Sequence, residues 1–195
     1  MEDVMTDQVI RGYLILGCMD YIDSFDEQRR ERVYSSLPSG VSRNRDAYDK
    51  MLWYPLKTIS GYYSAIANQH ADDDAKAYEA MLQCGRFIAE AATNTFLKLL
   101  MRIMTPAVFG KKAPDLWARD HRYGRMEAES TYLRDNHLIV RLHDVDGYEH
   151  AGPVAAGFAM FALKAVGASD IDVKVSDWSM KAPAPAQVKI DLKWK

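Results

Sequence analysis

The sequence predicts an α+β domain, in which N-terminal helices pack on a C-terminal antiparallel sheet built in the order strand–strand–helix–strand–strand. Apolar residues recur three and four apart over residues 74–104, which is the spacing of one helix face. After Gly124 apolar residues alternate with polar ones, which is typical of half-buried strands. An apolar segment at residues 153–166 separates the two pairs of strand-like segments. Because helices come first and strands follow, the order does not predict a doubly wound α/β fold.

The length predicts a single domain. The chain has 195 residues, close to the size of one domain. The helical part covers residues 20–122 and the strand-rich part residues 124–195. Together 25 Lys and Arg residues and 27 Asp and Glu residues give a net charge of −2, which excludes a strong basic surface for nucleic acid.

The first third of the chain predicts a strand followed by two helices. Residues 8–19 are rich in strand formers and predict one buried or edge strand. Residues 25–36 are polar with a helical composition, and Leu37-Pro38-Ser39-Gly40 ends that helix. Trp53-Tyr54-Pro55 then leads into an apolar segment at residues 56–67, for which we expect another helix.

The helix over residues 74–104 is the best-defined element. Gly85 lies within it, where glycine costs about 1 kcal/mol relative to alanine. We expect a close approach of the later helix, through Gly157, to offset this cost. Thr105-Pro106 ends the long helix, because proline disfavours helix in the preceding residue, and a short helix follows at residues 114–121.

The remaining segments predict four strands and one helix. Residues 125–134 and 137–145 form a hairpin through Asp135-Asn136. Residues 171–176 and 188–195 alternate in the same manner and predict the third and fourth strands.

The helix at residues 153–166 begins at Pro153, which suits a first helical turn, and carries one charge, Lys164. A helix that is apolar nearly all round must be covered on both sides. One side can lie on the sheet, and either the long helix or a second subunit covers the other. We expect a homodimer, with Phe158 or Phe161 at the interface or beneath it.

The sequence also predicts a cytoplasmic protein without a membrane span. Its acidic first ten residues lack the basic start and apolar stretch of a secretory signal. Its longest apolar run, residues 151–163, is shorter than the ~20 residues that cross a bilayer. In this setting Cys18 and Cys84 are expected to be buried free thiols, and no Cys/His spacing of a zinc site occurs.

Three segments carry a resemblance to a known superfamily. They are Trp53-Tyr54-Pro55 before a helix, Met81-Leu82-Gln83-Cys84-Gly85-Arg86-Phe87-Ile88, and residues 147–167 followed by 171–178. In these the chain resembles the superfamily that joins transport-protein-particle (TRAPP) subunits, 4-vinyl-reductase-type domains and heme-nitric-oxide-binding domains. Within that group it is most similar to a bacterial family of chains of this length without an assigned activity. The resemblance implies the predicted fold and a sensory or signalling role, but a fold does not fix a function.

The chain departs from these families where their cofactors are held. Heme-nitric-oxide-binding domains use a proximal histidine and a Tyr-x-Ser-x-Arg motif, and no such motif occurs here, since Tyr34-Ser35-Ser36 lacks the arginine. His121 lies at a helix–strand junction, and nothing in the sequence identifies it as a heme ligand. The vinyl-reductase-type domains carry cysteines near the late helix, whereas this chain has none after Cys84. We therefore expect no cofactor.

These observations favour a non-catalytic sensory or regulatory module that binds a small apolar ligand or a signalling protein. Trp53, Trp117 and Tyr123 flank the ends of predicted elements, where large aromatic residues can line a pocket or simply fill the core. Cys84 is the thiol in the best-defined motif, and buried thiols there are commonly inert packing. We take these four residues as the candidate ligand-binding residues.

A metal-dependent enzyme is the alternative hypothesis. His137, His143 and His150 lie within 14 residues, with Asp146 nearby, and imidazole and carboxylate groups bind transition metals. In a strand without a bulge, His137 and His143 share one face. The competing interpretation is a set of solvated or hydrogen-bonded histidines on a strand and its loop.

Overall fold

The computed structural model describes residues 8–92, 104–129, 135–176, 178–180 and 185–195. Its elements in chain order are β1 (Val9–Arg11), α1 (Gly12–Asp23), α2 (Glu27–Ser35), β2 (Trp53–Pro55), α3 (Leu56–Ala67), α4 (Asp74–Ala92), α6 (Pro106–Asp120), β3 (Arg125–Glu129), β4 (His137–His143), α7 (Ala151–Ala165), β5 (Asp172–Val175) and β6 (Gln187–Lys193). Short 3₁₀ turns occupy Arg45–Ala47 and Asn68–His70. The predicted α+β class is confirmed.

The C-terminal half forms a four-stranded antiparallel sheet in the order β3-β4-β6-β5. The pairing of β4 with β6 runs from His137 opposite Lys193 to His143 opposite Gln187 without a break. The alternation seen in the sequence fixes the two faces of this sheet. Its buried side chains on β4 and β6 include Leu138, Val140, Leu142, Val188, Ile190 and Leu192.

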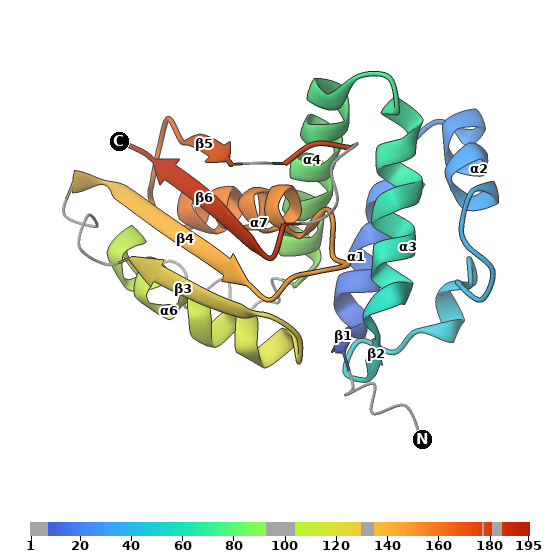
Figure 1. Ribbon diagram of the computed structural model, residues 1–195, viewed down its shortest axis with the longest axis horizontal. Helices are drawn as coiled ribbons and strands as arrows, with labels where there is room; N and C mark the ends of the chain where they lie inside the picture. The colour runs from blue at the N-terminus through green and yellow to red at the C-terminus, as the bar shows by residue number, and fades with distance from the viewer. Residues whose placement is uncertain (1–7, 93–103, 130–134, 177, 181–184) are drawn as a thin grey trace.

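Helix α7 connects the two halves of the molecule (Figure 1). It contacts β5 and β6 on the sheet side and packs extensively along α4 on the other. Helix α4 packs in turn on α1 and α3, and α6 lies along β3. Because α7 is covered by the sheet and by α4, the apolar nature of this helix is largely explained within one chain.

The expectation of a strand over residues 8–19 is wrong beyond its first part. Only Val9–Arg11 form a strand, paired with Trp53–Pro55, and helix α1 begins at Gly12. Apolar residues occupy nearly every position here, and Leu14, Ile15, Leu16, Cys18 and Met19 are all buried. A continuous apolar run fits a buried strand and a buried helix equally, and packing between α3 and α4 decides for the helix.

Helix α6 begins at Pro106 and ends at Asp120. It is therefore longer than the short helix expected at residues 114–121, and it starts at the Thr105-Pro106 pair. Thr105 is the N-cap of α6, and its hydroxyl accepts a hydrogen bond from the Val108 amide at 3.3 Å. Pro106 occupies the first turn, where its missing N–H group costs nothing. Residues 93–103 of the helix predicted over 74–104 lie outside the described residues. The same holds for residues 130–134 of the strand predicted at 125–134.

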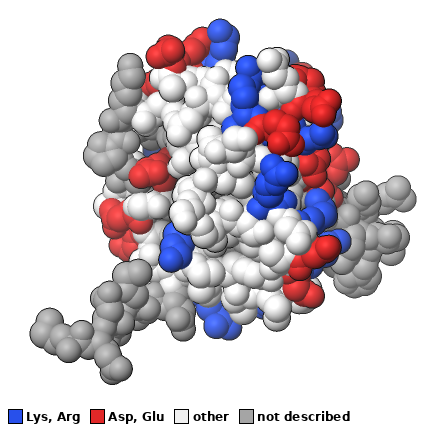
Figure 2. Space-filling view, turned by 90° about the vertical axis from the view of Figure 1, so that its right-hand side faces the viewer, with Lys and Arg blue, Asp and Glu red and all other residues white. Residues whose placement is uncertain are grey.

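The face that carries α2 is charged but balanced, since acidic and basic side chains are interspersed across it (Figure 2). Arg43 pairs with Glu31 at 3.3 Å and Arg45 with Asp20 at 2.6 Å. Among the described helices, none has the length and hydropathy that crossing a membrane requires.

Candidate functional site

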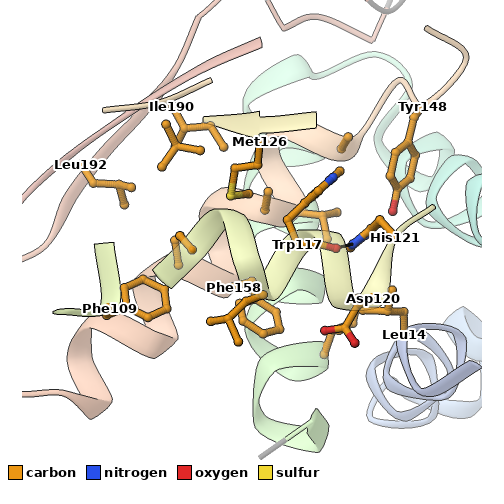
Figure 3. A pocket seen from close by; sticks show the side chains of 18 of the residues that line it. Leu14, Phe109, Trp117, Asp120, His121, Met126, Tyr148, Phe158, Ile190 and Leu192 are labelled. Carbon is orange, nitrogen blue, oxygen red and sulfur yellow. Dashed lines mark hydrogen bonds between the residues drawn. The ribbon is translucent and has the colours of Figure 1, made fainter. Parts of the chain in front are cut away.

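A cavity of about 80 Å³ lies where the helical half meets the sheet (Figure 3). Its wall is built from α1, α3, α4, α6, α7 and three strands of the sheet, and nearly all of it is apolar. The lining side chains are Tyr13, Leu14, Tyr63, Ile88, Phe109, Ala113, Leu116, Trp117, Asp120, His121, Met126, Leu138, Val140, Tyr148, Ala151, Val154, Ala155, Phe158, Ala159, Ile190 and Leu192. Any molecule bound here would touch both halves of the domain.

Polar groups of the wall are concentrated at one end of the cavity. There the Tyr13 hydroxyl donates to Oδ2 of Asp120 at 2.6 Å. Arg119 donates to the same carboxylate through Nε at 2.9 Å and through Nη2 at 2.6 Å. Burial and the neighbouring Asp120 raise the pKa of Tyr13, so the phenol stays protonated. Asp120, only 5% exposed, is therefore a fully paired carboxylate.

His121 follows α6 and turns its ring toward the cavity beside Trp117 (Figure 3). The two rings are stacked, with centroids 3.8 Å apart and planes 3° apart. Nδ1 of His121 lies 3.2 Å from the carbonyl oxygen of Trp117. Burial lowers the pKa of His121 to about 4. The imidazole is therefore neutral at neutral pH. Because the carbonyl oxygen can only accept, Nδ1 carries the proton, and Nε2 can accept a hydrogen bond.

Two tyrosines close the inner side of the cavity. The rings of Tyr63 and Tyr148 stack with centroids 5.7 Å apart and planes 9° apart, and the Tyr148 hydroxyl donates to that of Tyr63 at 3.4 Å. Burial raises the pKa of both phenols. Both tyrosines therefore remain neutral hydrogen-bonding groups.

Of the four candidate ligand-binding residues, Trp117 is the one that lines the cavity. Its indole Nε1 donates to the carbonyl oxygen of Tyr123 at 3.3 Å, and the Tyr123 hydroxyl donates to the carbonyl oxygen of Asp146. Cys84 lies in the core beside Cys18. These contacts make Tyr123 a support for the cavity wall.

Trp53 lies away from the cavity at the β1–β2 ladder. The guanidinium groups of Arg11 and Arg122 lie 4.0 Å and 4.3 Å from the centroid of its ring. Cation–π contacts of this kind stabilise a protein modestly. The structure thus gives Trp53 two cationic neighbours and no apolar ligand pocket.

The residues expected at a dimer interface differ in their surroundings. Phe158 lines the cavity. Phe161 is half-buried near the end of α7.

The three histidines of the metal hypothesis do not converge. Nε2 of His137 lies 2.9 Å from Asp191, and Nε2 of His143 lies 3.1 Å from Glu127. These two share the face of β4 that carries its paired charges, as expected without a bulge. His150 is buried at the start of α7, 6% exposed, with its ring 6.0 Å from that of Trp178. In the part of the chain that the structure describes, no group of three His, Cys, Asp or Glu residues could hold a metal.

Tyr63, Tyr148 and His121 are functional candidates that sequence reasoning did not select. Isolated aromatic residues at buried positions look alike whether they fill a core or line a cavity. The sequence contained one indication of this site. His121 lies at a predicted helix–strand junction, four residues after Trp117.

The residues at the cavity do not fit a heme, the cofactor that the resemblance raises. One histidine, His121, lines it, and the face of this ring is packed flat against Trp117. One water molecule needs about 10–15 Å³ of cavity volume. A cavity of about 80 Å³ therefore holds a small molecule and is too small for a porphyrin. Trp117, Phe109 and Phe158 occupy the surrounding space.

The fold is similar to that of solved H-NOX domains, although no family model and no curated protein matches the sequence. The Fe(II) unliganded H-NOX protein from K. algicida matches over 95% of this chain and 97% of its own, with a TM-score of 0.67 and 11% identity. An H-NOX protein from S. oneidensis in the Fe(II)NO state matches over 95% and 99%, with a TM-score of 0.64 and 10% identity. An oxygen-binding H-NOX domain related to soluble guanylate cyclases matches over 95% and 95%, with a TM-score of 0.63 and 11% identity. This chain therefore has the α+β fold of H-NOX domains.

Proposed function

We propose that the protein is a cytoplasmic, non-catalytic sensory module that binds a small apolar ligand in its central cavity without heme. The observation that carries the proposal is the cavity itself, an apolar space at the junction of the helical half and the sheet. An empty apolar cavity of about 150 Å³ inside a protein stays dry and takes up benzene. This cavity of about 80 Å³ therefore favours an apolar ligand smaller than benzene.

The polar end of the cavity supports a ligand with one hydrogen-bonding group. His121 and Tyr148 both line the cavity, and each carries a polar group that remains neutral at neutral pH because burial shifts its pKa. A small aromatic molecule with one N–H or O–H group could pack against Trp117 and bond to one of them. Asp120 is saturated by Tyr13 and Arg119, so a cationic ligand gains little there.

The position of the cavity supports a sensory role. A ligand that contacts both halves of a domain binds most tightly to one relative position of the two halves. Binding therefore shifts the equilibrium toward that conformation. Helix α7 contributes five lining residues, Ala151, Val154, Ala155, Phe158 and Ala159, and also packs on α4. A change in the position of α7 could then reach a signalling partner or a second copy of the chain.

We also propose the finer points that the resemblance implies. The chain belongs with the wider superfamily of TRAPP subunits and 4-vinyl-reductase-type domains, and it acts as a homodimer. The half-buried Phe161, one helical turn before the exposed Lys164 and Ala165 of α7, is the residue most suited to that interface.

Titration with pyrrole, followed by calorimetry, tests the proposed ligand site. Pyrrole is an aromatic molecule smaller than benzene with a single N–H donor, so it suits a cavity of about 80 Å³. We expect saturable binding with one site per chain. Ala159→Leu places extra carbons in the cavity and should abolish binding. Ala165→Leu makes the same change at an exposed position of the same helix and should leave binding unchanged. Absence of binding to the unaltered protein, or equal binding to both variants, would contradict the proposal.

A further inference from the structure

The two cysteines of the chain face each other in the core. Cys18 on α1 and Cys84 on α4 are both fully buried, with their Sγ atoms 3.6 Å apart. A disulfide needs sulfurs at about 2.05 Å, so the pair would have to close by about 1.5 Å. The two helices touch closely here, since a Cβ atom added at Gly17 would lie 2.8 Å from the Cα atom of Ile88.

Two tyrosines lie between this pair and the cavity. Tyr63 and Tyr148 both line the cavity, and the Tyr148 hydroxyl donates to the Tyr63 hydroxyl at 3.4 Å. The Tyr63 hydroxyl is close enough to Cys18 to influence the pKa of its thiol. The thiols therefore lie behind Tyr63, which forms part of the cavity wall.

We propose that Cys18 and Cys84 are a redox modification site, which hydrogen peroxide converts into a reversible intramolecular disulfide. In the first step the thiolate of one cysteine attacks a peroxide oxygen, the O–O bond breaks, and the products are a sulfenic acid and hydroxide, which takes up the released proton to give water. In the second step the other sulfur attacks the sulfenic sulfur and releases a second water molecule. Each molecule of peroxide thus oxidises two thiols by two electrons in total and is reduced to two molecules of water.

The burial of the pair decides which oxidants can act on it. A bulky, charged disulfide such as oxidised glutathione cannot reach sulfurs with no exposed surface, whereas hydrogen peroxide is neutral and only a little larger than water. Burial also raises the pKa of Cys18, which keeps the thiolate scarce, so the reaction is slow and faster at higher pH. The neighbouring thiol resolves the sulfenic acid in place, which protects it from further oxidation.

The bond would fasten two walls of the cavity together. Leu14 and Ile88 both line the cavity, and each lies one helical turn from its cysteine, on α1 and α4 respectively. The oxidised protein should therefore hold these two helices in one arrangement. This consequence rests on the proposed ligand site, whereas formation of the bond does not.

The test treats the chain of 195 residues with hydrogen peroxide, traps free thiols with an alkylating agent and measures the intact mass. We expect the loss of two hydrogen atoms, no alkylation, a peptide pair joining Cys18 to Cys84, and full reversal by dithiothreitol. The oxidised form should melt roughly 10 °C higher, because the bond closes a long loop. Oxidised glutathione at equal concentration should produce none of this in the folded protein, and should oxidise the protein unfolded in guanidinium.

The matched variants are Cys18→Ala and Cys84→Ala, which keep the core apolar. Each should accumulate sulfenic or higher acids on its remaining cysteine, or remain unreactive, and neither should show the rise in melting temperature. Free thiols in the unaltered protein after prolonged peroxide treatment, or sulfonic acids without a disulfide, would overturn the proposal. A pyrrole titration of both redox forms separates the two inferences, since disulfide formation without any pyrrole binding would contradict the ligand site alone.

Discussion

Gly85 of α4 and Gly157 of α7 allow the backbones of the two helices to touch. A Cβ atom added at Gly85 would lie 2.0 Å from the carbonyl oxygen of Val154, and one added at Gly157 would lie 2.0 Å from that of Leu82. Backbone atoms cannot move aside as a flexible side chain can. The close approach that the sequence predicted from a mid-helix glycine is thereby confirmed.

Gly85→Ala should therefore destabilise the protein. The variant gains about 1 kcal/mol of helix propensity, but overpacking against a backbone carbonyl costs more, so we expect a net loss of about 1–3 kcal/mol. Urea unfolding measures it. Glu90→Ala, at an exposed position of the same helix, is the control and should change stability by less than about 0.5 kcal/mol. A higher melting temperature for Gly85→Ala would show that α4 and α7 are not in close contact.

Acidification should destabilise the protein between pH 6.5 and about 4. Burial lowers the pKa of both His121 and His150 to about 4, whereas histidine in an unfolded chain titrates near 6.5. The unfolded state binds more protons in this window, so the free energy of unfolding falls as the pH falls, by up to about 1.4 kcal/mol per histidine and pH unit. Thermal melts at pH 7, 6 and 5 measure the slope, and His121→Phe should reduce it. An unchanged melting temperature from pH 7 to pH 5 would count against this burial.

Asp120→Ala should be more damaging than Tyr13→Phe. The first change leaves the Tyr13 hydroxyl without its acceptor, which costs about 1–3 kcal/mol for a buried donor, whereas Arg119, whose side chain is 51% exposed, is solvated by water. The second removes one hydrogen bond, worth about 1 kcal/mol, and leaves Asp120 paired with Arg119. Equal losses in urea unfolding of the two variants would contradict this order.

Sedimentation equilibrium at high protein concentration tests the homodimer. We expect a mass of two chains, because α7 carries half-buried apolar residues such as Met160 and Phe161 beyond those that face the cavity. A monomer at the highest concentration refutes the dimer. Phe161→Asp does not decide the question, since a carboxylate in an apolar contact destabilises monomer and dimer alike.

The sheet and α7 were predictable because local patterns determine them. Val188, Ile190, Leu192 and Trp194 alternate with polar residues and are all buried, as alternation requires. Helix α1 was not predictable in this manner, because an apolar run without polar interruptions has no readable period.

The cavity could not be predicted, because its wall is assembled by tertiary structure. Trp117 and His121 are close in sequence and were both noted, but Tyr63 and Tyr148 come from elements 85 residues apart. Nothing in either local sequence indicates that the two rings stack. A single sequence identifies buried aromatic residues and leaves open which of them face an empty space.

An absorption spectrum of the protein, produced in cells supplied with heme precursors, tests the absence of heme most directly. The geometry of His121 and Trp117 and the small volume of the cavity predict a spectrum of aromatic residues alone, without a Soret band. A stoichiometric Soret band that disappears in His121→Ala would contradict this prediction. It would mean that Trp117 and Phe158 move aside to admit a porphyrin with His121 as its ligand.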